Sequence, residues 1–240
     1  MKRIAAGAMV LILAGCSTVQ SKDVRTSGIT ATYVVTLPET TEVADVSASY
    51  RVGTLTFIEL GDGESVTTSG GGKEVKLKHH KSVGVTDYDG QLDGVVAAGT
   101  EITFDLTRGK ADGSAPKSTV KLPERVKLTA PQTGTTYSRR AALPVRFDSG
   151  PSDLPSLVSW AGDCIQAGSL QLEAGRTSVS IPPGSIHPVT GTPTPGRKPP
   201  TTCDVTLSLT RRTAGTLDPA FKDGSITAQS ESTRQITSAP

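Results

Sequence analysis

Histidine, the side chain that most often performs acid–base chemistry near neutral pH, is scarce in this chain of 240 residues. It occurs at His79, His80 and His187. Because neighbouring side chains on a strand point to opposite faces, His79 and His80 cannot easily bind one metal ion together. The sequence also lacks a Gly-x-Ser-x-Gly nucleophile turn and the common glycine-rich phosphate-binding loops. These observations predict no catalytic site, and we expect the protein not to be an enzyme.

One serine has a lysine at a spacing that some enzymes use. Ser114 and Lys117 form a Ser-x-x-Lys sequence, which resembles the motif of penicillin-recognising enzymes, where a helix places the lysine one turn from the serine. Pro116 and the glycine residues nearby disfavour a helix here, and the other motifs of that family are absent. We interpret the match as chance.

Three closely spaced aspartates, Asp87, Asp89 and Asp93, form the best metal-binding candidate in the sequence. Carboxylate oxygens suit Ca²⁺, which takes about six to eight oxygen ligands. However, the spacing does not match an EF-hand loop, and no glutamate follows at the position of the bidentate ligand. We favour a hairpin turn at Asp89-Gly90. The aspartates are therefore a weak calcium candidate, and we expect no metal or other cofactor.

The N-terminus has the layout of a secretory signal. Lys2 and Arg3 provide a basic start, and residues 4–13 form an apolar run. An apolar helix needs about 20 residues to cross a bilayer, so this run is too short to be a permanent membrane span. Small residues then precede Cys16, as they do at a cleavage site. We expect residues 1–15 to be removed as a signal peptide.

The sequence Leu13-Ala14-Gly15-Cys16 resembles the lipobox of bacterial lipoproteins. This resemblance implies that Cys16 is acylated, becomes the first residue of the mature protein, and holds it on a membrane through lipid. Two or three acyl chains anchor a protein stably, whereas one does not. The serine at position 17, in place of aspartate, implies the outer membrane of a Gram-negative cell, with the periplasmic or surface side left open. The alternative is that Cys16 is an ordinary thiol.

Cys164 and Cys203 are the other cysteines of the chain. An exported protein occupies a compartment in which disulfides form and persist, so we expect these two residues to pair. A metal or redox site has less support, because there is no Cys-x-x-Cys spacing and no neighbouring histidine. Closing a loop of about 40 residues should stabilise the fold by about 4 kcal/mol in the chain-entropy model.

The charge balance argues against a nucleic-acid partner. Removing Lys2 and Arg3 from the 25 basic residues leaves 23, which balance the 23 acidic residues. Nucleic-acid binders need clustered basic side chains and stacking aromatics, and aromatic residues make up 4% of this chain. One local basic cluster contains Lys73, Lys76, Lys78 and Lys81. We expect Lys76 and Lys78 to lie on the solvent face of an edge strand, where lysine prevents pairing with other chains.

Period-two apolar runs separated by turn residues fill the rest of the chain and predict an all-β fold. Residues 16–28 are polar and unpatterned, so we expect an acylated cysteine and a flexible tether. The pattern restarts near residue 123, which divides the chain into two tandem antiparallel β-sandwich domains, 29–123 and 124–240. The segment 182–200 contains seven prolines and is expected to be a long loop, either functional or a spacer.

Residues 126–138, V-K-L-T-A-P-Q-T-G-T-T-Y-S, resemble the opening strand of bacterial immunoglobulin-like and fibronectin type III-like modules. In an immunoglobulin arrangement Trp160 would lie on strand C and fill the core. Cys164 would then end strand C and Cys203 would begin strand F, so the disulfide would link adjacent strands of one sheet.

Three classes of function fit these features. The first is a non-enzymatic envelope lipoprotein, with an unidentified protein partner, that acts as a scaffold or protein-interaction module. The alternative is a carbohydrate- or matrix-binding surface module, although such sites usually expose aromatic side chains. An enzyme is the third class, and no nucleophile–base pair supports it.

Overall fold

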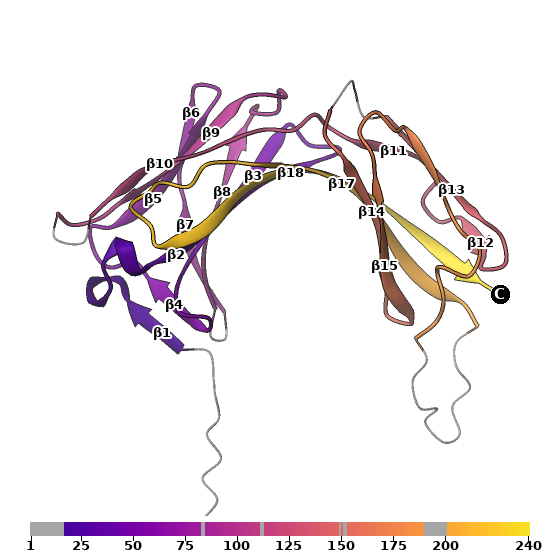
Figure 1. Ribbon diagram of the computed structural model, residues 1–240, viewed down its shortest axis with the longest axis horizontal. Helices are drawn as coiled ribbons and strands as arrows, with labels where there is room; N and C mark the ends of the chain where they lie inside the picture. The colour runs from indigo at the N-terminus through magenta and orange to yellow at the C-terminus, as the bar shows by residue number, and fades with distance from the viewer. Residues whose placement is uncertain (1–16, 83–84, 111–112, 149, 151–152, 190–200) are drawn as a thin grey trace, which may run out of the picture.

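Alternating apolar and polar residues fold into β-strands along almost all of the described chain. The computed structural model describes residues 17–82, 85–110, 113–148, 150, 153–189 and 201–240. Two β-sandwiches are joined as an arch (Figure 1), which confirms the predicted all-β fold. Helical structure within the described ranges consists of two short 3₁₀ turns, η1 (Ser21–Asp23) and η2 (Thr26–Gly28). Those ranges contain no helix with the length and apolarity needed to span a membrane.

The first half of the chain supplies ten strands. They are β1 (Ser17–Gln20), β2 (Thr30–Pro38), β3 (Val43–Val52), β4 (Thr56–Glu59), β5 (Ser65–Gly70), β6 (Lys73–Lys76), β7 (Lys78–Ser82), β8 (Val85–Asp93), β9 (Glu101–Thr107) and β10 (Ala115–Lys121). The second half supplies eight more. They are β11 (Lys127–Ala130), β12 (Thr136–Ser138), β13 (Leu143–Asp148), β14 (Ser156–Gly162), β15 (Ile165–Leu172), β16 (Ser178–Ile181), β17 (Cys203–Ala214) and β18 (Asp223–Ala239).

Three sheets build the two sandwiches. Sheet A has eleven strands, and its main path runs β1-β4-β3-β2-β18-β17-β14-β15, with β7, β8 and β12 joined at its sides. Sheet B (β10-β9-β5-β6) covers one half of sheet A, and sheet C (β11-β13-β16) covers the other half. Figure 1 shows sheet A along the inner side of the arch and sheets B and C along the outer side.

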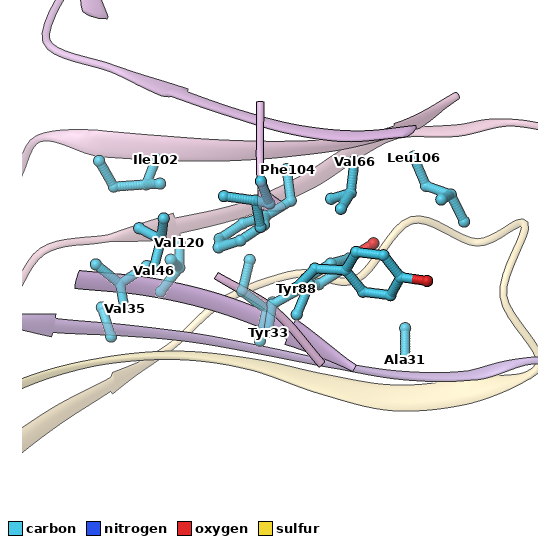
Figure 2. Packing of buried hydrophobic residues seen from close by; sticks show 14 of the residues in the cluster. Ala31, Tyr33, Val35, Val46, Val66, Tyr88, Ile102, Phe104, Leu106 and Val120 are labelled. Atoms are coloured by element: carbon cyan, nitrogen blue, oxygen red, sulfur yellow. The ribbon is translucent and has the colours of Figure 1, made fainter. Parts of the chain in front are cut away.

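Each sandwich has its own apolar core. In the N-terminal core, alternate residues of sheet A face those of sheet B, as Figure 2 shows. Tyr33 stacks on Phe104 with ring centroids 4.4 Å apart, and its hydroxyl lies 3.2 Å from the hydroxyl of Tyr50. That hydrogen bond satisfies two buried polar atoms. In the C-terminal core Trp160 is buried among apolar residues of sheets A and C, as the sequence predicts.

The last strand belongs to both sandwiches. Residues 223–231 of β18 pair with β2, and residues 227–238 pair with β17. Ile226 therefore packs in the N-terminal core, whereas Ile236 packs in the C-terminal core. Leu122 packs in the first core and Val126 in the second, on either side of residue 123. The structure nevertheless differs from a purely sequential division, because the end of the chain completes the first sandwich.

Three of the strand pairs are parallel, whereas the sequence predicts antiparallel sandwiches. β1 pairs in parallel with β4, and β18 pairs in parallel with both β2 and β12. Each of these pairs joins segments that no tight hairpin turn connects, so a local turn does not dictate their direction. The other pairings in the described chain are antiparallel.

The predicted turn at Asp89-Gly90 is wrong, because β8 runs through it without interruption. Gly90 serves packing rather than chain reversal. A Cβ atom at this position would lie 2.6 Å from a terminal methyl of Leu77, where the chain crosses from β6 in sheet B to β7 in sheet A. The absence of a Cβ atom at Gly90 thus leaves room for the buried Leu77 side chain to pack against β8.

Candidate functional site

The segment that follows Cys16 is folded, which corrects the prediction of a flexible tether over residues 16–28. Ser17–Gln20 form β1, which pairs with β4, and Ser21 and Thr26 are buried. Buried hydrogen bonds hold this segment together with the partly buried Val19 and Val24, and two valines five residues apart give no apolar period that would identify it in the sequence. Cys16 and the predicted signal peptide, residues 1–15, lie outside the described residues.

Arg108 is the centre of the hydrogen bonds that hold this segment. Its guanidinium group donates to the carbonyl oxygen of Ser21 at 2.6 Å, to the hydroxyl of Thr26 at 2.9 Å and to Glu64 at 2.9 Å. The Arg108 side chain is fully buried, and that of Glu64 is 9% exposed. A planar guanidinium with several fixed donors suits this arrangement better than an ammonium group would.

Glu64 remains ionised despite its burial. Desolvation alone would raise its pKa, but hydrogen bonds from the Ser21 hydroxyl, the Gly61 amide and Arg108 outweigh that effect and lower its pKa below the ordinary value. The carboxylate, in the turn between β4 and β5, therefore links that turn and the first 3₁₀ turn to Arg108, which directly follows β9. This network fixes the position from which the chain leads back to Cys16.

The beginning of β1 lies beside an exposed turn. Ser17 is the register partner of Thr56, the first residue of β4, and Leu55 directly precedes Thr56. Leu55 is 55% exposed, and Val189 is the other large hydrophobic residue found exposed in the described part of the chain. Beside the turn, the guanidinium of Arg51 lies 5.9 Å from the ring centroid of half-buried Phe57. This end of the sandwich therefore presents an apolar tip with an adjacent cation.

The lysine cluster is exposed at sheet edges, as the sequence predicts, but it is divided between two strands of different sheets rather than lying on one strand. β6 is an edge strand of sheet B, and β7 is bonded to β8 alone and forms an edge of sheet A. Lys76 and Lys78 are exposed, while Leu77 between them is buried. Lys81 donates a hydrogen bond to Glu59 at 2.9 Å, and this bond is the main cause of the lowered pKa of Glu59. His79 lies 3.8 Å from the same carboxylate.

The free face of sheet A carries a row of polar side chains across five strands. Register partners place Arg212, Gln229, Thr36, Asp45 and Gln91 side by side on β17, β18, β2, β3 and β8. Arg212 donates to Gln229 at 3.0 Å, and the amide of Gln229 donates to the Thr36 hydroxyl at 3.3 Å. Gln91 donates to Asp45 at 2.8 Å. The row ends at Arg212, one residue beyond the last residue of β17 that pairs with β14.

An open groove of about 770 Å³ lies at the Gln91 end of this row. Asp45, Asp89 and Gln91 line one part of it, and Lys76, Lys78 and His80 line another. The lining thus combines both charge signs with amide and hydroxyl groups. Such a surface suits polar contacts with a macromolecule more than an apolar small molecule.

The calcium candidates Asp87, Asp89 and Asp93 lie along β8 with spacings of two and four residues. Residues two apart on a strand share a face but lie about 7 Å apart, so they do not surround one ion. Burial raises the pKa of Asp87, and the charge of Asp89 adds to this effect. In the described ranges, no three histidine, cysteine or acidic side chains are grouped so that they could hold a metal ion.

The other candidate residues are dispersed. Ser114 bonds the Arg108 amide at 2.9 Å, while Lys117 lies on strand β10, so the Ser-x-x-Lys sequence is not helical. His187 bonds Gln166 at 2.7 Å and lies far along the chain from His79 and His80. The part of the 182–200 loop that is described, 182–189, bonds to β15 and to the turn that contains Cys164. Residues 190–200 lie outside the described ranges.

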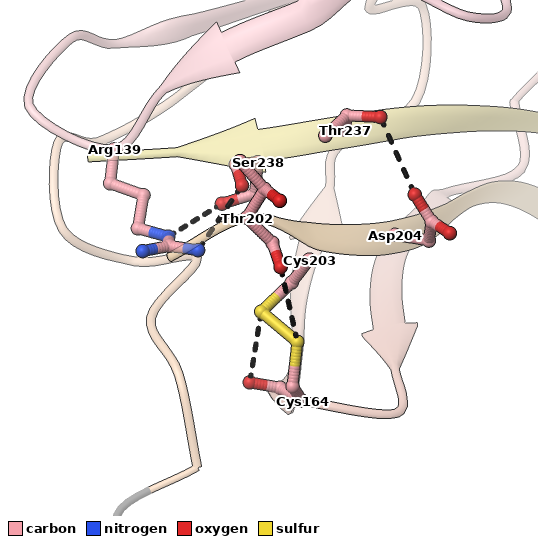
Figure 3. The surroundings of a disulfide bond; sticks show 7 residues. All are labelled: Arg139, Cys164, Thr202, Cys203, Asp204, Thr237 and Ser238. Carbon is pink, nitrogen blue, oxygen red and sulfur yellow. Dashed lines mark hydrogen bonds between the residues drawn. A yellow bond between two sulfur atoms is a disulfide. The ribbon is translucent and has the colours of Figure 1, made fainter. Parts of the chain in front are cut away.

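Cys164 and Cys203 form the predicted disulfide, with Cα atoms 5.8 Å apart (Figure 3). Cys203 begins β17, and Cys164 lies in the turn between β14 and β15. Because β14 and β17 are antiparallel neighbours, the bond links adjacent parts of one sheet, as the sequence predicts. Figure 3 also shows Arg139 donating to the Ser238 hydroxyl at 2.8 Å, which ties the end of β18 to the same region.

Comparison with known proteins identifies no close relative. No family model matches the chain, and no curated protein matches it. Among solved structures, the chain is similar to the fibronectin(III)-like modules of Clostridium thermocellum CbhA, at 12% identity, with 87% of this chain and 94% of that chain covered and a TM-score of 0.22. A TM-score of this size does not establish a shared arrangement, so the fold assignment rests on the sheets described above.

Proposed function

We propose that this protein is a lipid-anchored envelope lipoprotein whose arch of two β-sandwiches acts as a non-enzymatic scaffold for a protein partner. The anchor is the Cys16 lipid, and the polar row on sheet A is the face that meets the partner. The observation that carries the proposal is the continuity of this row across five strands of sheet A, from Arg212 on β17 to Gln91 on β8. A shared strand, β18, keeps the two parts of the face in register.

The polar row has the composition of a protein-binding surface of modest affinity. Its side chains carry guanidinium, amide, hydroxyl and carboxylate groups that already hydrogen-bond to one another on the sheet, so less rotamer freedom is lost on binding. The groove beside Gln91 adds a hollow lined by charges of both signs, and such charges favour one orientation of the bound protein and discriminate between partners.

The anchor is tested by intact-mass analysis of the protein purified from bacterial membranes. We expect a mass that corresponds to residues 16–240 with acyl chains attached, and we expect the Cys16→Ser variant to lack those chains. Finding the unmodified full-length chain in the soluble fraction would refute the anchor.

The scaffold role is tested by photo-crosslinking in intact cells. A photoreactive residue replaces Gln91 or Ser208 on the free face of sheet A, or Thr103 on the outer face of sheet B as the matched control. We expect a discrete protein adduct from positions 91 and 208 and none from position 103. Equal adducts at all three positions, or none at any, would contradict a partner on sheet A.

The alternative of carbohydrate binding has less support. Sugar-binding sheets usually stack sugar rings on exposed aromatic side chains, and here the aromatics pack mainly in the cores. Phe57 and Tyr137 are the partly exposed ones among the described residues, and neither lies in the polar row. Binding of purified protein to a glycan array would reinstate this alternative.

A further inference from the structure

No flexible segment separates the proposed lipid on Cys16 from the folded body. Ser17 is already a strand residue, and consecutive Cα atoms are about 3.8 Å apart. A flexible tether of twelve residues would instead span about 20 Å on average and leave the body free to turn. The position of the N-terminal sandwich on the membrane is therefore set by the structure around Ser17.

The exposed turn between β3 and β4 lies at that point. From Cys16 the path runs one residue to Ser17, across the ladder to Thr56 and back one residue to Leu55, a distance of at most about 12 Å. The β7–β8 hairpin lies at the same end of β3, because Asp87 pairs with Ser49 and the strand continues from there to Val85, the partner of Ser82. The Leu55 side chain is thus held close to the residue that carries the acyl chains.

We propose that the β3–β4 turn, with Leu55 at its tip, inserts into the headgroup region of the bilayer in which Cys16 is anchored. The inference rests on the proposed lipid anchor and adds the surface that faces the membrane. The partner is the phospholipid surface, since an exposed leucine and half-buried Phe57 supply apolar contact and Arg51 beside them can reach phosphate groups.

That the turn contacts the phospholipid surface follows from its place beside Ser17, the residue next to Cys16. A single exposed leucine on a protein surface is ordinary by itself. Here, however, the segment that ends beside it leads directly to Cys16, and the Arg108 network prevents that segment from swinging away. β1 then points away from the bilayer, and the polar row of sheet A is held at a fixed orientation above it.

A fluorescent label reports the depth of the turn. Leu55→Cys introduces the one free thiol in a chain whose other cysteines are acylated or paired, and an environment-sensitive nitrobenzoxadiazole dye is attached to it. The matched control is Thr40→Cys, an exposed position in the β2–β3 turn at the opposite end of β3. Both acylated proteins are reconstituted into phosphatidylethanolamine–phosphatidylglycerol vesicles, with or without brominated lipid.

We expect the label at position 55 to emit at shorter wavelength and to be quenched by brominated lipid, whereas the label at position 40 keeps its aqueous emission. Equal behaviour at the two positions would overturn the inference. Intact mass on the same samples separates the two proposals: an unacylated Cys16 would overturn the anchor and this inference together, and an acylated protein with an aqueous label at position 55 would overturn this inference alone.

An inserted tether tests the role of β1. Eight glycine and serine residues placed between Cys16 and Ser17 leave the lipobox intact and free the body from the anchor. We expect the acyl mass to be unchanged and the quenching at position 55 to fall. Unchanged quenching would show that β1 does not set the position of the turn.

Discussion

Arg108 holds the segment after Cys16 through a buried ion pair and two further hydrogen bonds, so its loss should release that segment. We predict that Arg108→Met lowers the free energy of unfolding by about 3–5 kcal/mol, because Glu64 is left buried without its cation. Urea unfolding at neutral pH measures this. Trypsin should also cut faster after Lys22 and Arg25, whose side chains are already exposed, because the backbone of the released segment can then enter the protease active site.

The matched control for this variant is Lys81→Met. Lys81 also pairs with a glutamate, Glu59, but its side chain is 52% exposed. Removing an exposed ion pair costs about 1 kcal/mol or less. If the two substitutions had equal effects on unfolding and on cleavage, Arg108 would have no special part in holding the N-terminal segment.

The lowered pKa of Glu64 predicts a loss of stability in acid. Hydrogen bonds from Ser21, Gly61 and Arg108 keep the native pKa below the ordinary value of 4.5, so the unfolded chain binds a proton more readily than the native one. Stability from this group is therefore complete above that value and is lost as the pH falls through the native pKa. Urea midpoints of the protein and of Glu64→Gln between pH 7 and pH 3 test this: the variant should be less stable at pH 7 and lose less on acidification. Parallel curves would contradict it.

At the residue level, the sequence predicts the disulfide pair but not the hydrogen-bond network of Arg108. Cys164 and Cys203 are predictable because export leaves them as partners for each other. Arg108 is not, because Ser21, Thr26 and Glu64 lie 44 to 87 residues away and nothing marks this arginine as buried. Leu55 carries a weak signal, since it is an apolar residue in a turn that begins with Gly53.

Among the elements, β18 depends on a glycine at its beginning. Gly224 has a φ of 137°, and a Cβ atom there would lie 1.8 Å from the carbonyl oxygen of Ala31 on β2. We predict that Gly224→Ala destabilises the protein by at least about 2 kcal/mol, because strain and collision act together. Gly28→Ala is the control, because its Cβ would make one ordinary contact, with Val24 at 3.5 Å. Thermal unfolding followed by circular dichroism compares them, and similar melting temperatures would contradict the prediction.

Strand positions are predictable from sequence because one face of each strand is buried, as the alternation in β2 shows. Strand partners are not, because the period of two is the same whichever strand lies beside it. The parallel pairing of β2 with β18 joins residues almost 200 positions apart. β1 is not predictable for a different reason: buried hydrogen bonds hold the segment that it begins, and its partly buried apolar residues, Val19 and Val24, are too few to show a period of two.

At the scale of the whole molecule, ion pairs brace the junction between the sandwiches. Arg234 on β18 binds Glu39 at 2.7 Å, and this bond is the main cause of the lowered pKa of Glu39. Arg211 on β17 lies 3.5 Å from Glu124 in the connecting segment. The hydroxyls of Ser230 and Ser232 accept hydrogen bonds from the backbone amides of Val126, at the end of that segment, and of Leu128 on β11. These contacts and the shared strand oppose bending of the arch.

The shared strand predicts that the two halves of the chain differ in their ability to fold alone. Residues 17–123 lack β18, so β2 becomes an open edge and the N-terminal core loses Phe221, Ile226 and Ala228. Residues 124–240 retain sheet C, their part of sheet A and the disulfide. We expect the fragment 124–240 to unfold cooperatively and the fragment 17–123 to show no cooperative transition by circular dichroism.

Trp160, the one tryptophan of the chain, reports the C-terminal core by fluorescence and provides the control for fragment 124–240. Mixing the fragments should restore a cooperative transition to residues 17–123, because β18 of the second fragment then supplies the missing strand. A native-like transition in 17–123 alone would contradict a shared architecture. If the prediction holds, residues 17–123, the half nearest the proposed anchor, depend on the other half for β18. The arch then behaves as one unit rather than as two independent modules on a tether.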